Sequence, residues 1–219
     1  MGGYPIILDL ADRLAVVVGG GAVGRRKVAG LLEAGARVRL VTREPVPPGC
    51  WQQPVELRLR PFHPVDLDDA AIAFAATGIA EIDRAVRDAA RERRIPVNLA
   101  ASPADGDFAL PAVLRRGDLL LAVATGGRAP ALAGVVRDRL AAGYGPEWGL
   151  AVEIAARLRT NKLTASSENV YSYKVLADLV DNGLIVLLAR RDETGIGHLL
   201  TRICGRETTL AGLGLTLPD

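Results

Sequence analysis

The sequence contains few of the residues that build disulfide frameworks and metal sites. Its only cysteines are Cys50 and Cys204 among 219 residues, too few and too far apart for a disulfide framework or a cysteine-based metal site. Its only histidines, His63 and His198, lie in no cluster with cysteine or carboxylate residues. We therefore predict no metal site formed by the protein.

Long apolar runs and a strong charge of either sign are also missing. No run of about 18 apolar residues occurs, so we expect no membrane-spanning helix. Residues 1–10 lack the basic start and the cleavage site of a signal peptide. The net charge of +2 argues against a strongly basic nucleic-acid-binding protein and against an acidic tail protein. We expect a cytoplasmic protein with no nucleic-acid or membrane partner.

The composition is that of a folded protein, with 49% hydrophobic and 24% charged residues. The first half of the chain alternates apolar runs typical of buried strands with segments of helical periodicity. This order predicts an α/β fold with a parallel sheet and helices on both faces. The predicted strands are 14–19, 37–42, 55–60, 71–76 and 96–100, and the predicted helices are 23–34, which stops at Gly35, and 80–93.

The pattern changes in the second half of the chain. Two strand-like runs surround a turn, and a helix follows with Pro130 in its first turn, where proline is tolerated. The remaining 70 or so residues have mostly helical periodicity. The predicted strands are 108–114 and 119–124, and the predicted helices are 131–142, 147–158, 175–181 and 195–203, with stops at Gly183 and Gly205.

A glycine-rich turn is the strongest local motif. It contains G-x-G-x-x-G, follows a hydrophobic strand and opens a helix. Gly19 allows the tight turn, Gly21 lets the backbone approach a pyrophosphate, and Gly24 permits close helix–strand packing. The first amides of the helix then face the anion. We predict a dinucleotide contact formed by Gly19, Gly20, Gly21, Ala22, Val23 and Gly24; a glycine-rich turn without a ligand is the alternative.

The acidic residue that usually ends the second strand of such a site is displaced here. The strand ends on Thr42, then Arg43, and Glu44 comes slightly late. These three residues are predicted to flank the adenosine ribose. Arg43 leaves NADP open beside NAD, because an arginine favours the extra phosphate, although it is equally well explained as a solvated loop charge.

Several further segments, in the right order, resemble the siroheme synthase family. This family comprises bifunctional precorrin-2 dehydrogenases and sirohydrochlorin ferrochelatases. The resemblance runs from residue 4 to about 140 and weakens in the helical tail. The segments that carry it are 8–10, 15–27, 31–38, 74–77 (family A-A-T-D/N), 96–98 (N-V-x-D), 107–112 (D-F-x-x-P-A) and 125–132 (S/T-G-G-x-S-P-x-L).

The resemblance implies three parts: an NAD-binding Rossmann domain (1–112), a dimerisation region (113–145) and a helical C-terminal domain (146–219). It implies a homodimer whose two subunits complete the active-site cleft. It also implies two reactions, in which precorrin-2 loses a hydride to NAD⁺ and a proton to give sirohydrochlorin, and ferrous iron is then inserted. Thr77, at the end of the fourth strand, is expected near the nicotinamide half of the cofactor.

The sequence departs from the family at the acid/base position. The family's strand ends on an aspartate that serves both reactions, and Ala101 occupies that position here. The polar residue after Thr77 is also lost, because Gly78 follows. Three explanations stay open: an engineered substitution made to trap a complex, a natural variant in which Asp105 or Asp107 takes over, and a protein that binds tetrapyrrole without turnover.

Both alternative acids also have ordinary structural explanations. Asp107 matches a residue that the family carries and is better explained as a capping or turn residue, and Asp105 lies in a common turn sequence. The substrates carry eight carboxylates, so their cleft should offer cations and N–H donors. The predicted substrate contacts are Asn98, Thr125, Gly126, Gly127 and Arg128. An unrelated small NAD(P) dehydrogenase is the remaining alternative.

Overall fold

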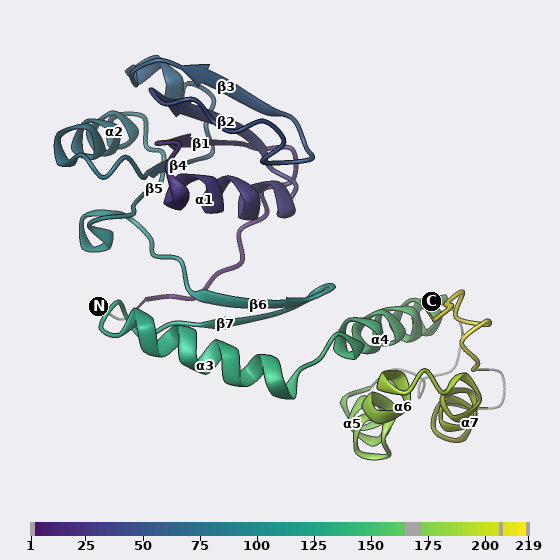
Figure 1. The fold of residues 1–219 in the computed structure, drawn as a ribbon. Coiled ribbons are helices and arrows are strands. Elements are labelled where there is room, and N and C mark those ends of the chain that lie inside the picture. The colour runs from purple at the N-terminus through teal and green to yellow at the C-terminus, as the bar shows by residue number, and fades with distance from the viewer. Residues whose placement is uncertain (1–2, 165–171, 206–207, 218–219) are drawn as a thin grey trace. The chain divides into compact units, whose positions relative to one another are not determined.

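The computed structural model describes residues 3–164, 172–205 and 208–217 (Figure 1). The chain divides into two compact units. The first comprises residues 1–110 together with 126–128, and the second comprises residues 111–125 and 129–219. The predicted division into three parts stays a prediction.

The first unit is built on a five-stranded sheet in which every neighbouring pair of strands is parallel. All five predicted strands are present, within one residue at either end. The order of the strands reverses at β1, because β2 lies on one side of it and β4 on the other. The order is β3-β2-β1-β4-β5, with β1 at Leu14–Val18, β2 at Arg37–Thr42, β3 at Val55–Leu59, β4 at Ile72–Ala75 and β5 at Val97–Leu99.

One helix covers each face of this sheet, as predicted (Figure 1). Alternate side chains of β1 enter two separate cores, since successive residues of a strand point to opposite faces. Val17 packs in the core that holds Val28 of α1 (Ala22–Glu33). Val16 packs in the core that holds Val86 of α2 (Ala80–Glu92). Every residue of β1 is buried, which explains its continuous apolar sequence.

The second unit contains a two-stranded antiparallel sheet and five helices among the described residues. The sheet pairs β6 (Ala112–Arg116) with β7 (Leu119–Val123), and α3 (Pro130–Gly143) packs on both strands. The remaining helices, α4 to α7, enclose a core of leucine and isoleucine side chains. These helices are α4 (Glu147–Thr164), α5 (Tyr173–Asp181), α6 (Leu184–Ala189) and α7 (Glu193–Cys204).

The structure corrects two predictions in this second half and adds one helix that was not predicted. Residues 108–111 are not part of a strand, because β6 begins only at Ala112. Helix α4 continues six residues beyond the predicted end at Leu158. Helix α6 was not predicted, because its six residues span fewer than two turns and show no clear periodicity. Within the described residues, no helix combines the length and the hydropathy needed to cross a membrane.

A buried carboxylate ties the edge strand β3 to the rest of the first unit. Asp66, in the 3-10 helix η1 (Pro64–Leu67), has no exposed surface. It accepts hydrogen bonds from Arg58, which is in β3, and from Arg60, which directly follows β3. Its carboxylate also accepts from the His63 N–H at 2.8 Å, and its carbonyl accepts from Arg39 of β2. Burial raises the pKa of Asp66, but the hydrogen bonds from Arg60, His63 and Arg58 lower it to about 2.

This carboxylate is expected to make stability fall in acid. Because the folded pKa is below the ordinary value of 3.8, its contribution is complete above pH 3.8 and is lost as the pH falls towards 2. Asp66→Asn should lower the free energy of unfolding at pH 7 by roughly 1.5–3 kcal/mol. Urea unfolding of both proteins at several pH values measures this difference. A difference that does not shrink between pH 5 and pH 2 would contradict the assignment.

Candidate functional site

The glycine-rich turn is shaped by two close backbone contacts. Gly19 follows β1 with a φ of +114°, and its N–H donates to the Val41 carbonyl at 2.8 Å. A Cβ at Gly19 would collide with the carbonyl of Ala76, and a Cβ at Gly24 would collide with the carbonyl of Gly19. Glycine is therefore required at both positions for steric reasons, as the motif predicts.

The other two glycines of the turn have different surroundings. A Cβ at Gly20 would lie 2.6 Å from Oγ1 of Thr42, so the turn passes directly beside the end of β2. Gly21 is exposed, and apart from its chain neighbours no atom of the described residues lies within 4 Å of a Cβ position there, so these residues do not require glycine. A ligand that approaches the backbone would supply the missing reason for Gly21.

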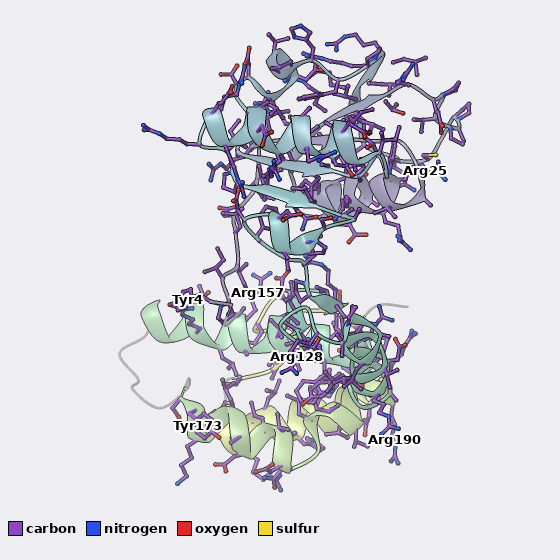
Figure 2. All side chains as sticks on the ribbon, turned by 90° about the vertical axis from the view of Figure 1, so that its left-hand side faces the viewer. Tyr4, Arg25, Arg128, Arg157, Tyr173 and Arg190 are labelled. Carbon is purple, nitrogen blue, oxygen red and sulfur yellow. The ribbon has the colours of Figure 1, made fainter. Side chains whose placement is uncertain are left out.

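The start of α1 is suited to an anion. The N-cap residue, Gly21, has no side chain to cap the helix, and the first turn contains no acidic residue, so the first amides and the positive dipole end suit a ligand. Arg25, labelled in Figure 2, donates through its guanidinium to the Gly20 carbonyl at 3.0 Å. This places a positive charge beside the turn. Arg25 was not among the predicted site residues, although the basic run 25–27 directly after the motif is a signal for it.

Two threonines flank the turn from opposite sides. Thr42 is buried, and its Oγ1 accepts from the Glu44 N–H at 3.2 Å, while Arg43 and Glu44 are exposed. Thr77 follows β4, and its backbone nitrogen would lie 2.8 Å from a Cβ at Gly19. The structure therefore brings the predicted adenosine-side and nicotinamide-side residues to the same edge of the sheet, on either side of β1.

Lys27 and Asn98 form a polar link between α1 and β5. Lys27 Nζ donates to Oδ1 of Asn98 at 2.8 Å and lies 5.1 Å above the Phe74 ring. Burial, together with the charge of Arg26, lowers the pKa of Lys27. Asn98 is 3% exposed, and its Nδ2 donates to the Phe108 carbonyl at 2.9 Å. Its amide is thus used inside the first unit, where it positions the segment after β5.

The three candidate acid/base positions lie in the segment that follows β5. Ala101 is exposed and offers only a methyl group. Asp107 accepts from the Val97 N–H at 2.9 Å, and its own N–H donates to the Val97 carbonyl at 2.8 Å. Asp105 is exposed, and its carbonyl accepts from Arg91. Asp107 therefore has a structural role in fixing the segment, and its use as a base stays a prediction.

The predicted substrate loop, residues 125–128, directly precedes helix α3. Thr125 Oγ1 accepts from the Ala129 N–H at 3.2 Å, immediately before Pro130 opens the helix. Gly126 and Gly127 both have positive φ angles, and both are exposed, as is Arg128. The exposed loop therefore carries one cation and a turn that only glycine adopts easily.

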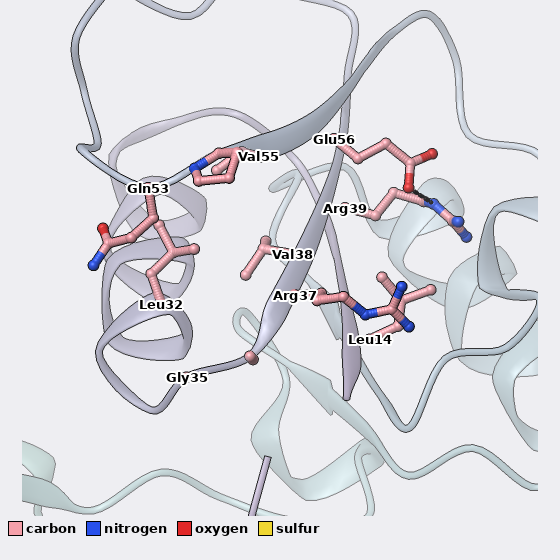
Figure 3. Close-up of a pocket in the computed structure, with 11 residues that line it drawn as sticks. Leu14, Leu32, Gly35, Arg37, Val38, Arg39, Gln53, Val55 and Glu56 are labelled. Carbon is pink, nitrogen blue, oxygen red and sulfur yellow. Dashed lines mark hydrogen bonds and ion pairs between the residues drawn. The ribbon is translucent and has the colours of Figure 1, made fainter. Parts of the chain in front are cut away.

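A pocket in the first unit does not coincide with the predicted site. An open pocket lies between the last turn of α1 and the amino-terminal ends of β1, β2 and β3, with the Arg39–Glu56 ion pair in its wall (Figure 3). Ligands of open α/β sheets bind at the carboxyl ends of the strands. The pocket is at the other end, and it contains none of the predicted site residues.

Comparisons with known proteins agree with this geometry. Residues 6–112 match a family described as "Putative NAD(P)-binding". The chain is 40% identical over 159 residues to the siroheme synthase of Methylobacillus flagellatus, which covers 71% of this chain. It is 34% identical over 204 residues to siroheme synthase 1 of Halorhodospira halophila, which covers 90% of this chain. These comparisons support the siroheme synthase family for this chain.

The chain spans only part of these siroheme synthases, 34% of the length of the first and 42% of the second. A solved structure titled "SirC, precorrin-2 dehydrogenase" has a TM-score of 0.69 to this chain at 23% identity. It covers 92% of this chain and 98% of its own. The family expected from the sequence is supported, and the expected fold is confirmed.

Two glycine-to-alanine variants test whether steric contact shapes the turn. Gly24→Ala places its Cβ against the Gly19 carbonyl and should destabilise the first unit by about 2 kcal/mol or more. Gly30→Ala, in the same helix, meets no atom within 4 Å and should stabilise by up to about 1 kcal/mol. Thermal unfolding of the two variants and the parent checks both signs. If the two variants changed stability by the same amount and sign, helix propensity and not the close contact would determine the effect of the substitution at Gly24.

Proposed function

We propose that the chain is an NAD-dependent precorrin-2 dehydrogenase that produces sirohydrochlorin in siroheme biosynthesis. The observation that carries the proposal is the glycine-rich turn between Thr42 and Thr77 at the carboxyl edge of the parallel sheet. Relatives of the chain are named siroheme synthases, and a solved structure with the same fold is titled a precorrin-2 dehydrogenase.

The residues of the first unit suit a dinucleotide. The amides at the start of α1 and the guanidinium of Arg25 would hold the pyrophosphate, and Gly21 would let it approach the backbone. The segment 42–44 would contact the adenosine ribose, and Thr77 would contact the nicotinamide half. When bound, NAD⁺ supplies the acceptor for the hydride that leaves precorrin-2. The protein contributes by positioning the two reactants.

The proton lost in the same reaction has no obvious acceptor at Ala101. Loss of a general base typically costs about 10²–10⁴-fold in rate, so turnover through positioning alone would be slow. This observation favours a second function, tetrapyrrole binding without turnover. We also propose the second reaction of the family, iron insertion into sirohydrochlorin, with ferrous iron as a substrate. The described residues contain no group of three or more His, Cys, Asp or Glu side chains arranged to hold a metal.

A homodimer is proposed for the assembly, with support from the second unit. Among the described residues, each strand of its two-stranded sheet pairs along one edge only, and no residue of β7 is fully buried. Helix α3 also exposes Leu132, Val135 and Val136. A second copy of the chain would cover this apolar surface. Exposed loop residues such as Arg128 would then be available to bind substrate carboxylates.

Gly21→Ala tests cofactor binding separately from folding. Because the protein leaves open space at this position, the variant should keep the parent's unfolding temperature. Its methyl group would meet the pyrophosphate and should weaken NAD⁺ binding by about tenfold or more. Calorimetric titration with NAD⁺, beside thermal unfolding, measures both quantities. Unchanged NAD⁺ affinity would count against the proposed placement of the pyrophosphate.

Ala101→Asp tests the acid/base position. The parent and the variant are given precorrin-2 and NAD⁺, and the absorbance of sirohydrochlorin is followed. We expect the variant to be faster by about 10²–10⁴-fold, because it restores a proton acceptor. Equal turnover would direct attention to Asp105 and Asp107. If neither protein turns over but both bind the tetrapyrrole, the binding function replaces the dehydrogenase.

A further inference from the structure

A buried carboxylate beside the glycine-rich turn has an unusual set of partners. Asp83, in the first turns of α2, is 4% exposed. One of its oxygens, Oδ1, accepts from the Thr77 N–H at 3.1 Å and from the Thr77 hydroxyl at 2.6 Å. The other oxygen, Oδ2, is buried and has no hydrogen-bond partner in the described part of the chain. Thr77 therefore supplies the hydrogen bonds that this carboxylate receives.

These contacts fix the direction of the Thr77 hydroxyl. A distance of 2.6 Å is typical of a hydroxyl that donates to a carboxylate, which is a strong hydrogen bond. The competing acceptor, the Ile79 carbonyl, lies 3.3 Å away. Turning the hydroxyl proton outward would remove a donor from a buried carboxylate that already lacks one, which is costly. The proton therefore stays on the side of Asp83.

The hydroxyl of Thr77 can then only accept from a ligand. A hydroxyl oxygen has one proton and two lone pairs. The proton goes to Asp83, and one lone pair accepts from the Ile79 N–H at 3.1 Å. One lone pair remains on a residue that is partly exposed and whose backbone adjoins Gly19. A phosphate or carboxylate oxygen, which also needs a donor, is disfavoured at this position.

We propose that Asp83 is a positioning residue that orients Thr77 to accept a hydrogen bond from the carboxamide N–H₂ of the nicotinamide. This inference rests on the proposed function, since it assumes that NAD⁺ binds at the turn. Thr77 lies on the β4 side of the turn and Thr42 on the β2 side, so the two halves of the cofactor have separate neighbours. The carboxamide is the donor that distinguishes the nicotinamide ring.

The test compares three ligands by calorimetric titration. NAD⁺ carries the carboxamide, 3-acetylpyridine adenine dinucleotide has a methyl group in place of its N–H₂, and ADP-ribose lacks the ring. The parent should bind NAD⁺ about three- to tenfold more tightly than the acetylpyridine analogue, as expected for one hydrogen bond. Thr77→Val should bring this ratio close to one while leaving ADP-ribose affinity unchanged, and Thr77→Ser should keep the ratio of the parent.

Asp83→Ala tests the orienting role itself. Without the carboxylate the hydroxyl is free to turn, so the ratio should fall as in Thr77→Val. Asp88→Ala, an exposed residue of the same helix, is the matched control and should change no affinity. If Asp83→Ala fails to fold by thermal unfolding, the two Thr77 variants decide the result.

Three other outcomes would overturn the inference, and one of them would also overturn the proposed function. Equal weakening of all three ligands in Thr77→Val would show a purely structural role and overturn the inference. A parent ratio near one, with tight binding of both dinucleotides, would also overturn it and leave the proposed function intact. Failure of the parent to bind NAD⁺ and ADP-ribose would overturn the proposed function together with the inference.

Discussion

The close approach of the glycine-rich turn to its neighbours is the constraint on which the site depends. Gly19 has no room for a side chain against the backbone of Ala76 and Thr77, and Gly24 has none against Gly19. These two contacts set the position of the α1 amino terminus over the carboxyl edge of the sheet. They also set the distance between the turn and Thr77. A bulkier residue at either position would separate the parts that together can hold a dinucleotide.

Ala101, at the proposed acid/base position, offers no polar group, while the segment around it is held by several hydrogen bonds. The segment after β5 is fixed by hydrogen bonds between Asp107 and Val97 and between Asn98 and Phe108, and Lys27 links β5 itself to α1 through Asn98. Binding and positioning depend on many such contacts, whereas proton transfer depends on one group at one place. At the proposed acid/base position, an alanine would therefore affect chemistry far more than architecture, and for this reason both a slow enzyme and a binding protein are consistent with the same fold.

Patterns within short stretches predicted much of the first unit. The strand β1 is buried on both faces and reads as an apolar run, and α1 ends where Gly35 adopts a positive φ. The second half was less predictable. Helix α6 is too short to show a period, and residues 108–111 are apolar without pairing with another strand. In such segments, packing and strand pairing rather than local preference decide the structure.

By itself, the sequence determined the alternation of strands and helices, the glycine positions of the turn and the absence of an acid at Ala101, because each of these depends on residues close together in the chain. Only the tertiary structure decided which polar groups are used internally. It brought Asp83 into a hydrogen bond with Thr77, six residues away in the sequence, and Lys27 into a hydrogen bond with Asn98, 71 residues away. The physical reason is that a side chain's hydrogen-bond partner and burial follow from how distant elements pack, and no local spacing encodes them.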